Sequence, residues 1–232
     1  MPTVILLRHG RTTANTGGVL AGWTPGVLLD ERGVEQVGAV AQRLAQVPLA
    51  AIVSSPLERC RQTAEAVAAG RELTVQDDDR LGEARYGDWT GRTLKDLVKE
   101  PMWKVVQQHP SAAVFPGPEG EGLAQTQARA VAAVRSWNAA LPPDAVWLAC
   151  SHGDVIKSIL ADALGLHLDQ FQRIVVDPAS ISVVTYTETR PFVLRINDTG
   201  GDVSPLIPPP RKRRRRKPSS DAAVGGGAGA TV

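Results

Sequence analysis

Residues 3–12 read TVILLRHGRT, an apolar run followed at once by basic and polar side chains. The aliphatic residues of this run predict a short buried strand, and Gly10 ends it in a turn. We therefore expect Arg8 and His9 at the carboxyl end of the strand, the edge at which open α/β sheets bind ligands. An arginine fork beside an imidazole at that edge indicates a phosphate group held next to a nucleophile.

The rest of the chain alternates between strand-like and helix-like segments, which predicts an α/β fold. Further strands are expected at residues 50–53, 73–75, 145–149, 181–186 and 192–196. Helices are expected at residues 31–46, 56–69, 93–99, 122–140 and 153–164. Asp30 and Ser55 are the expected N-caps of the first two helices. Loops are expected at residues 11–30 and 81–92, and a surface insertion rich in Pro and Gly at 100–120.

The composition indicates one domain and a tail. A chain of 232 residues with 43% hydrophobic content can bury one sizeable core. From about Gly201 onward the sequence is mainly Pro, Arg, Lys, Ser, Gly and Ala, so we expect a domain at 1–200 and a disordered tail at 201–232. The basic run 211–217 leaves 19 basic against 24 acidic residues elsewhere. We expect this run to be solvated, with contact to nucleic acid or another polyanion as the alternative.

Composition also narrows the class of protein. The two cysteines, Cys60 and Cys150, show no CxxC or metal-ligand spacing, which favours free, buried thiols in a reducing compartment. The sequence has no signal-peptide pattern and no apolar run of transmembrane length, so a cytoplasmic protein without a membrane span is expected. Aromatic residues make up only 4% of the chain, which argues against a platform for stacking nucleobases.

Four separated polar motifs carry the chemistry. In chain order they are Arg8-His9-Gly10 with Asn15, the segment 55–64 (SPLERCRQTA) around Arg59, Glu83 ahead of 86–91 (YGDWTG), and Ser151-His152-Gly153. Cleavage of a phosphate monoester requires charge neutralisation, an in-line nucleophile and a proton for the leaving alkoxide. The guanidinium, imidazole and carboxyl groups of these motifs supply a candidate for each role.

Through the order and spacing of these motifs, residues 3–196 resemble the histidine phosphatase superfamily, in its phosphoglycerate-mutase-like branch. The resemblance implies a three-layer α/β sandwich in which helices flank a mostly parallel central sheet. It implies that His9 is the nucleophile that becomes phosphohistidine and that Glu83 protonates the leaving group. The phosphoryl oxygens would be bound by Arg8, Arg59 and His152. The substrate pocket would also include Gly10, Thr12, Asn15, Gly22 and Gly153, although Asn15 has capping of the loop as its alternative role.

Elementary chemistry sets conditions on these roles. The charges of the nearby arginines favour a neutral His9, whose second ring nitrogen needs an acceptor such as a backbone carbonyl near Gly10. Because arginine can hold phosphate oxygens in bidentate fashion, we expect no metal and no cofactor. Glu83 must be protonated in order to donate, so mildly acidic pH is favoured unless burial raises its pKa.

Departures from the mutase pattern favour hydrolysis. Mutases of the family that this chain resembles usually have Glu after Arg-His-Gly, an Arg-Arg pair, and a Glu-Arg-His-Tyr-Gly stretch. The present chain has Arg11 at the first position, only Lys104 as a base in 100–120, and Glu83-Ala84-Arg85-Tyr86-Gly87 at the third. Retaining a doubly phosphorylated intermediate requires the missing positive charge. We therefore expect a metal-independent phosphatase acting on a phosphorylated small molecule.

Two other functions remain open. One is a phosphoglycerate-mutase-type phosphomutase, and the other is a low-turnover module that binds a phosphoryl ligand and uses its tail to contact a polyanion. A homodimer is expected from general frequency alone. Several conspicuous side chains are expected at the surface: Glu58, Arg61, Glu65, His109 and His167. Trp23 and Trp103 are expected either at the substrate entrance or in the core.

Overall fold

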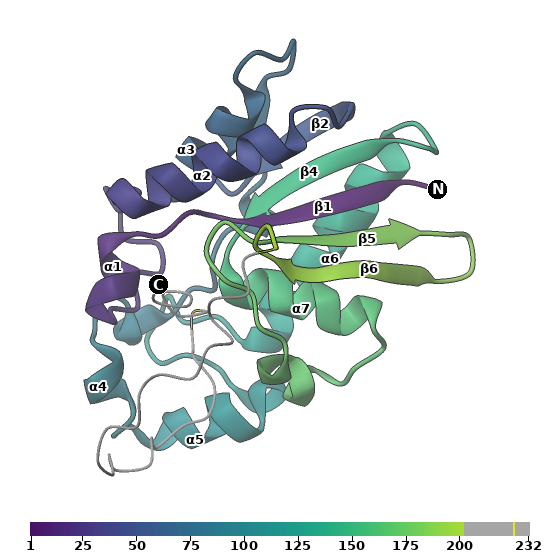
Figure 1. Ribbon diagram of the computed structural model, residues 1–232. Coiled ribbons are helices and arrows are strands. Elements are labelled where there is room, and N and C mark those ends of the chain that lie inside the picture. The colour runs from purple at the N-terminus through teal and green to yellow at the C-terminus, as the bar shows by residue number, and fades with distance from the viewer. Residues whose placement is uncertain (202–224, 226–232) are drawn as a thin grey trace.

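A central β-sheet organises the molecule in the computed structural model, which describes residues 1–201 and residue 225 (Figure 1). Within these residues six strands form one sheet in the order β3-β2-β4-β1-β5-β6. The strands are β1 (Thr3–Arg8), β2 (Leu49–Ser54), β3 (Val75–Asp77), β4 (Val146–Ser151), β5 (Ile181–Tyr186) and β6 (Pro191–Asp198). The first four strands in sequence pair in parallel, and β5 and β6 pair antiparallel. The expected mostly parallel α/β sheet is confirmed.

Helices cover both faces of this sheet. On one face lie α2 (Glu31–Leu44) and α3 (Glu58–Ala68), and on the other lie α6 (Leu123–Ala140) and α7 (Gly153–Ala163) (Figure 1). Successive side chains of β1 point to opposite faces of the sheet, so the strand packs against both helical layers. Ile5 and Leu7 belong to the hydrophobic cluster with α2 and α3, whereas Val4 and Leu6 belong to the cluster with α6 and α7. The expected three-layer arrangement is therefore present.

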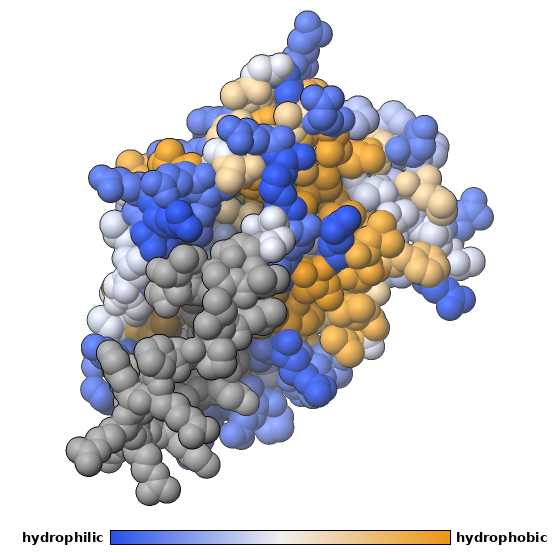
Figure 2. Space-filling model, in the orientation of Figure 1, coloured by the Kyte–Doolittle hydropathy of each residue, from blue (hydrophilic) through white to orange (hydrophobic). Residues whose placement is uncertain are grey.

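The shorter elements lie beyond the carboxyl edge of the parallel strands or along the surface. They are the helices α1 (Thr13–Gly17), α4 (Leu94–Leu97) and α5 (Pro101–Gln108) and the 3₁₀ turns Asp79–Leu81, Gly87–Trp89, Pro110–Ala112 and Leu168–Arg173. In the described part of the chain, no helix combines the length and apolarity required to cross a bilayer. The edge strand β6 exposes Phe192, Leu194 and Ile196, and Figure 2 shows apolar surface over the region of β5 and β6.

Helix starts were only partly foreseen from sequence. Asp30 caps α2 as expected, because its Oδ1 accepts a hydrogen bond from the Gly33 amide at 2.7 Å. Ser55 was expected to cap the next helix, and this is wrong: α3 begins at Glu58 with Leu57 as N-cap. The Ser55 hydroxyl instead lies 2.8 Å from Nε2 of His152, so tertiary contact has taken the side chain away from the helix end.

Three other expectations need correction. The strand expected at 73–75 runs from Val75 to Asp77, and the long loop 11–30 contains α1. The segment 100–120 is not merely a surface insertion. It forms α5, with Pro101 in the first turn, and buries Trp103, Val106 and Phe115 in the core. The apolar spacing along this segment outweighs its Pro and Gly content, because these side chains pack against Trp89 and its neighbours.

The sheet brings three strand ends together. In the parallel register Arg8 pairs with Ser151, and Ser54 pairs with Cys150. The residues that directly follow β1, β2 and β4 therefore meet at one edge, where the four polar motifs converge. The expected tail at 201–232, including the basic run 211–217, lies outside the described residues apart from Gly201 and Gly225.

Candidate active site

His9 is buried at the end of β1 with one ring nitrogen already committed. Its Nδ1 lies 2.7 Å from the carbonyl oxygen of Gly10, which can only accept, so Nδ1 carries the proton. Nε2 is left with the lone pair. Burial lowers the pKa of His9 well below its ordinary value, and the charges of Arg59 and Arg8 lower it further. The geometry thus provides a neutral, oriented imidazole, with the acceptor in the Gly10 region that the sequence led us to expect.

His152 approaches His9 from the end of β4. The two ring centroids are 5.3 Å apart, and the ring planes are inclined at 60°. Nδ1 of His152 lies 3.2 Å from Nη2 of Arg59, a group that only donates, so the proton of the neutral ring is on Nε2. Nε2–H then donates to the Ser55 hydroxyl. Burial lowers the pKa of His152 well below its ordinary value, with further lowering by Arg59, so the ring is neutral.

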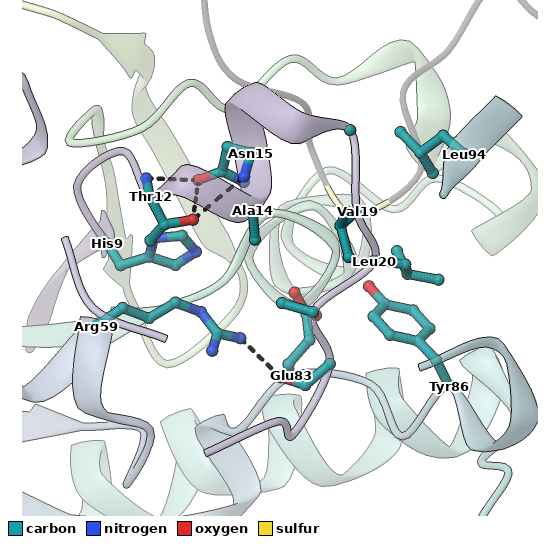
Figure 3. Close-up of a pocket in the computed structure, with 14 residues that line it drawn as sticks. His9, Thr12, Ala14, Asn15, Val19, Leu20, Arg59, Glu83, Tyr86 and Leu94 are labelled. Atoms are coloured by element: carbon teal, nitrogen blue, oxygen red, sulfur yellow. Dashed lines mark hydrogen bonds between the residues drawn. The ribbon is translucent and has the colours of Figure 1, made fainter. Parts of the chain in front are cut away.

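Two buried guanidinium groups flank the imidazoles. Arg8, on β1, donates through Nη1 to the carbonyl of Val176 at 2.8 Å. Arg59, on α3, is 2% exposed and donates through Nη2 to the carbonyl of Gly22 at 2.9 Å. Nη1 of Arg59 is buried and has no hydrogen-bond partner among the described residues. Because Arg59 lines the pocket beside His9, this nitrogen is a donor available to a ligand (Figure 3).

Glu83 is the buried carboxyl group of the site. Burial, followed by the negative charge of Asp154, raises its pKa to about 7 against opposing effects that include the charge of Arg59. Oε1 accepts from the Ala84 amide at 3.0 Å, while Oε2 lies 3.8 Å from Nδ1 of His152. The Glu83 backbone carbonyl is held by the indole of Trp23 and the guanidinium of Arg129. Glu83 is therefore a rigidly placed acid that keeps its proton up to near-neutral pH.

The loop after β1 lines one side of the pocket between these groups (Figure 3). Thr12 and Asn15 form a capping box at the start of α1, in which Oδ1 of Asn15 accepts from the Thr12 amide and hydroxyl, each at 3.0 Å. Capping, the alternative role considered for Asn15, thus occupies its oxygen, and the amide NH₂ group remains as its donor. The pocket lining is His9, Thr12, Ala14, Asn15, Gly18, Val19, Leu20, Ala21, Gly22, Arg59, Glu83, Tyr86, Leu94 and Gly225.

The structure brings the sequence-predicted residues to one place and leaves others outside it. Of the predicted residues, the pocket lining contains His9, Thr12, Asn15, Gly22, Arg59 and Glu83. Arg8, Gly10 and His152 are outside this lining but bond to lining residues, and Gly153 follows His152 in the chain. Arg61 pairs with Asp77 at 3.3 Å on the surface, and the side chains of His109 and His167 are exposed, as expected. Trp103 lies in the core. The thiols of Cys60 and Cys150 are free and buried, as expected.

Sequence reasoning missed three contributors. Ser55 bonds to His152, Tyr86 lines the pocket, and Asp154 is buried directly after Gly153. A signal was present for each, because all three fall inside or next to a recognised motif. An acidic residue in the turn after a His-Gly pair, expected beside two arginines, is a natural candidate for a site residue.

Comparison with known proteins places the chain in a family. The family model of the histidine phosphatase superfamily (branch 1) matches residues 4–199. Phosphoserine phosphatase 1 of Hydrogenobacter thermophilus is 31% identical over 211 residues, covering 86% of this chain and 93% of that protein. A Yersinia pestis protein named "Probable phosphoglycerate mutase GpmB" is 33% identical over 192 residues, covering 82% and 87%. The structure of YhfR from Bacillus stearothermophilus is similar with a TM-score of 0.78 and 28% identity, over 85% of this chain and 98% of that one. By its motifs, its fold and these relatives, the chain belongs to the histidine phosphatase superfamily (branch 1).

Proposed function

We propose that the protein is a phosphatase that hydrolyses phosphate monoesters of small molecules through a phosphohistidine on Nε2 of His9. The observation that carries the proposal is Nη1 of Arg59, a buried donor without a partner among the described residues, in the pocket that His9 also lines. Leaving such a donor unsatisfied costs about 1–3 kcal/mol. A phosphoryl oxygen in the pocket would satisfy it.

In the first half-reaction, Nε2 of His9 attacks phosphorus. The P–N bond forms while the ester P–O bond breaks, and the proton on Glu83 passes to the leaving oxygen. Arg8 and Arg59 neutralise the charge on the phosphoryl oxygens as the transition state develops. The bond from Nδ1 of His9 to the Gly10 carbonyl holds the ring in place and supports the positive charge that appears on it.

In the second half-reaction, water attacks the phosphohistidine. The Glu83 carboxylate left by the first step takes a proton from this water, the P–N bond breaks, and inorganic phosphate leaves. His9 returns to its neutral form and Glu83 to its protonated form. The cycle therefore needs water as its only co-substrate, and no metal or cofactor.

Hydrolysis is favoured over phosphoryl transfer between two sites of a substrate. Arg11, which occupies the position of the mutase Glu, is paired with Asp30 at 2.9 Å and is not part of the pocket lining. Lys104 is exposed on α5 and is likewise not in that lining. Among the described residues, the positive charge comes from Arg59 in that lining and from Arg8, which donates to the lining residue Gly225, and this suits one phosphoryl group. A phosphoglycerate-mutase-type phosphomutase, supported by the names of relatives such as the Yersinia protein, is the second candidate.

Three finer assignments belong to the same proposal. An acid-phosphatase type of enzyme agrees with a Glu83 that keeps its proton at mildly acidic pH. A small phosphorylated substrate agrees with the name of the Hydrogenobacter relative, a phosphoserine phosphatase. A cytoplasmic location agrees with the two free, buried thiols. Homodimer formation and polyanion contact through 211–217 stay predictions.

The test compares wild type with His9→Ala for hydrolysis of p-nitrophenyl phosphate between about pH 4 and 8 in EDTA. The exposed His167→Ala variant is the matched control. We expect His9→Ala to lose turnover, His167→Ala to retain it, and mass spectrometry of the quenched wild-type enzyme to find phosphate on His9. A His9→Ala enzyme with wild-type turnover, or an adduct on another side chain, contradicts the proposal. A bisphosphoglycerate-dependent mutase assay separates the second candidate.

A further inference from the structure

Asp154 is a buried acidic residue that the catalytic steps above do not use. It lies in the first turn of α7, directly after Gly153, and is 1% exposed. Its Oδ1 lies 3.5 Å from Nζ of Lys157, which is also buried and donates to Oε1 of Gln172 at 3.1 Å. Burying an ion pair does not by itself stabilise a fold, because desolvation offsets the attraction between the charges. This pair therefore needs an explanation other than stability.

The second carboxylate oxygen of Asp154 lies toward the pocket. Oδ2 accepts a hydrogen bond from the backbone amide of Gly225 at 2.9 Å, and the Tyr86 hydroxyl lies 3.4 Å away. Gly225 and Tyr86 both line the pocket that contains His9 and Glu83. One oxygen of Asp154 is thus held by Lys157, while the other meets a donor inside the pocket.

Gly225 also contacts a phosphate-binding arginine. Its carbonyl oxygen accepts from Nη2 of Arg8 at 3.3 Å, while its amide donates to Asp154. The amide nitrogen and carbonyl oxygen of one residue are roughly 3 Å apart, as bond lengths dictate. A single small group therefore spans from the donor on Arg8 to the acceptor on Asp154. A ligand whose acceptor and donor are a few bonds apart could in the same way accept a hydrogen bond from Arg8 and donate one to Asp154.

We propose that Oδ2 of Asp154 selects substrates by accepting a hydrogen bond from an ammonium group a few bonds from the phosphoryl group, so that the preferred substrates are phosphate monoesters of amino alcohols. This inference rests on the proposed phosphatase function. An ammonium group is favoured over a hydroxyl because its positive charge is attracted to the carboxylate in addition to donating a hydrogen bond, and this attraction is strong where water is excluded. The amide of Gly225 occupies the place of the substrate donor.

A second observation puts Asp154 close to the reacting atoms. Its charge is a leading cause, after burial, of the raised pKa of Glu83. A leaving group protonated by Glu83 therefore lies within the electrostatic reach of Asp154. Substitution of Asp154 will change the acidity of Glu83 and hence the rate for every ester, so the test has to use a ratio of two esters in which that common effect cancels.

The experiment measures kcat/KM for 2-aminoethyl phosphate and for ethyl phosphate, which differ only in the donor. Wild type, Asp154→Asn and Asp162→Asn are compared as full chains. Asp162 is the matched control because it lies on the same helix and pairs with Arg135 at the surface at 3.3 Å. We expect the amino-to-ethyl ratio to fall about 10-fold to 100-fold in Asp154→Asn, as loss of a charged hydrogen bond implies, and to stay unchanged in Asp162→Asn.

Two additions keep the result decisive. The double variant Asp154→Asn/Lys157→Met leaves no unpaired buried charge, and its thermal midpoint reports folding separately from selectivity. Both esters are also measured as competitive inhibitors of p-nitrophenyl phosphate hydrolysis, which reports binding where turnover is slow. The inference is overturned if the amino-to-ethyl ratio is the same in wild type and Asp154→Asn, both for kcat/KM and for inhibition. It is also overturned if wild type prefers 2-hydroxyethyl phosphate over ethyl phosphate by more than it prefers 2-aminoethyl phosphate. Hydrolysis that survives in His9→Ala would instead overturn the proposed function.

Discussion

At the scale of single residues, the two imidazoles have opposite tautomers. His9 is protonated at Nδ1 by its contact with the Gly10 carbonyl, and His152 is protonated at Nε2 because Arg59 donates to its Nδ1. His9 therefore presents its free nitrogen at Nε2. His152 instead is fixed between Ser55 and Arg59, in a position to orient the guanidinium. This asymmetry follows from which neighbour can only donate and which can only accept.

The arginine on α3 provides a first prediction. Arg59→Lys is expected to lower kcat/KM by ~10²–10³, because a single ammonium group cannot bond to the Gly22 carbonyl, His152 and a phosphoryl oxygen with the same fixed geometry. Arg61→Lys, two residues away in a surface ion pair, is expected to retain wild-type kinetics. Steady-state hydrolysis of p-nitrophenyl phosphate measures both variants. Equal losses in the two variants would contradict the role of Arg59.

The carboxyl group provides the prediction on pH. Because the pKa of Glu83 is raised to about 7, the acid is protonated below that pH and loses its proton above it. The rate for an alkyl phosphate, which needs a proton on its leaving oxygen, should therefore fall as pH rises through 7. Glu83→Gln should lower this rate by ~10²–10⁴ and remove the alkaline limb.

The pH prediction is measured as kcat/KM for ethyl phosphate against pH. p-Nitrophenyl phosphate serves as the comparison because its leaving group is already stable as an anion and depends less on the acid. Glu58→Gln, at an exposed carboxylate that bonds to the Gly26 amide, should keep the wild-type profile. An alkaline limb that persists in Glu83→Gln would assign the titration to another group.

At the scale of elements, the turn after β1 determines where His9 lies relative to α2. A Cβ atom on Gly10 would lie 2.7 Å from the Gly33 carbonyl oxygen and 2.7 Å from Cγ2 of Val37, both on α2. The strand and helix therefore approach each other as closely as a glycine allows. This contact fixes the Gly10 carbonyl that holds the His9 ring.

Gly10→Ala is expected to lower the free energy of unfolding by about 1–3 kcal/mol, since overpacking forces α2 to move. It should also lower turnover, because the acceptor for Nδ1 of His9 moves with the turn. Gly38→Ala is the control within α2, where an added Cβ meets nothing within 4 Å and alanine is expected to stabilise by roughly 0.5–1 kcal/mol. Urea unfolding and p-nitrophenyl phosphate hydrolysis give the two readings. If Gly10→Ala changes neither the free energy of unfolding nor turnover, the close contact between Gly10 and α2 does not constrain the site.

At the scale of the whole molecule, the core extends beyond the sheet into the segment 100–120. Trp103 of α5 packs with Trp89, their ring centroids 6.2 Å apart, and Phe115 packs against both Trp89 and Tyr86. Because Tyr86 lines the pocket, this satellite of the core supports one wall of the site. The Pro-rich segment is thus part of the domain interior.

Trp103→Ala is expected to lower the free energy of unfolding by about 3–5 kcal/mol, the cost of a large cavity in a packed core. Leu194→Ala, on the exposed side of β6, should change it by less than about 0.5 kcal/mol. Thermal or urea unfolding of both variants measures the difference. If the Trp103→Ala protein is as stable as Leu194→Ala, segment 100–120 is a surface insertion, as its composition suggested, and not part of the core.

The sequence by itself determined most strands of the sheet and the chemical groups of the site. A short apolar run identified β1, the cap of α2 followed from Asp30, and the motifs around His9, Arg59, Glu83 and His152 could be recognised because each is a local stretch of sequence. Only the tertiary structure decided the protonation states and the neighbours. The pKa of Glu83 and the placement of Ser55 and Asp154 depend on burial and on polar or charged groups supplied by distant segments. These effects arise when the chain closes the pocket, because electrostatic interactions strengthen where water is excluded.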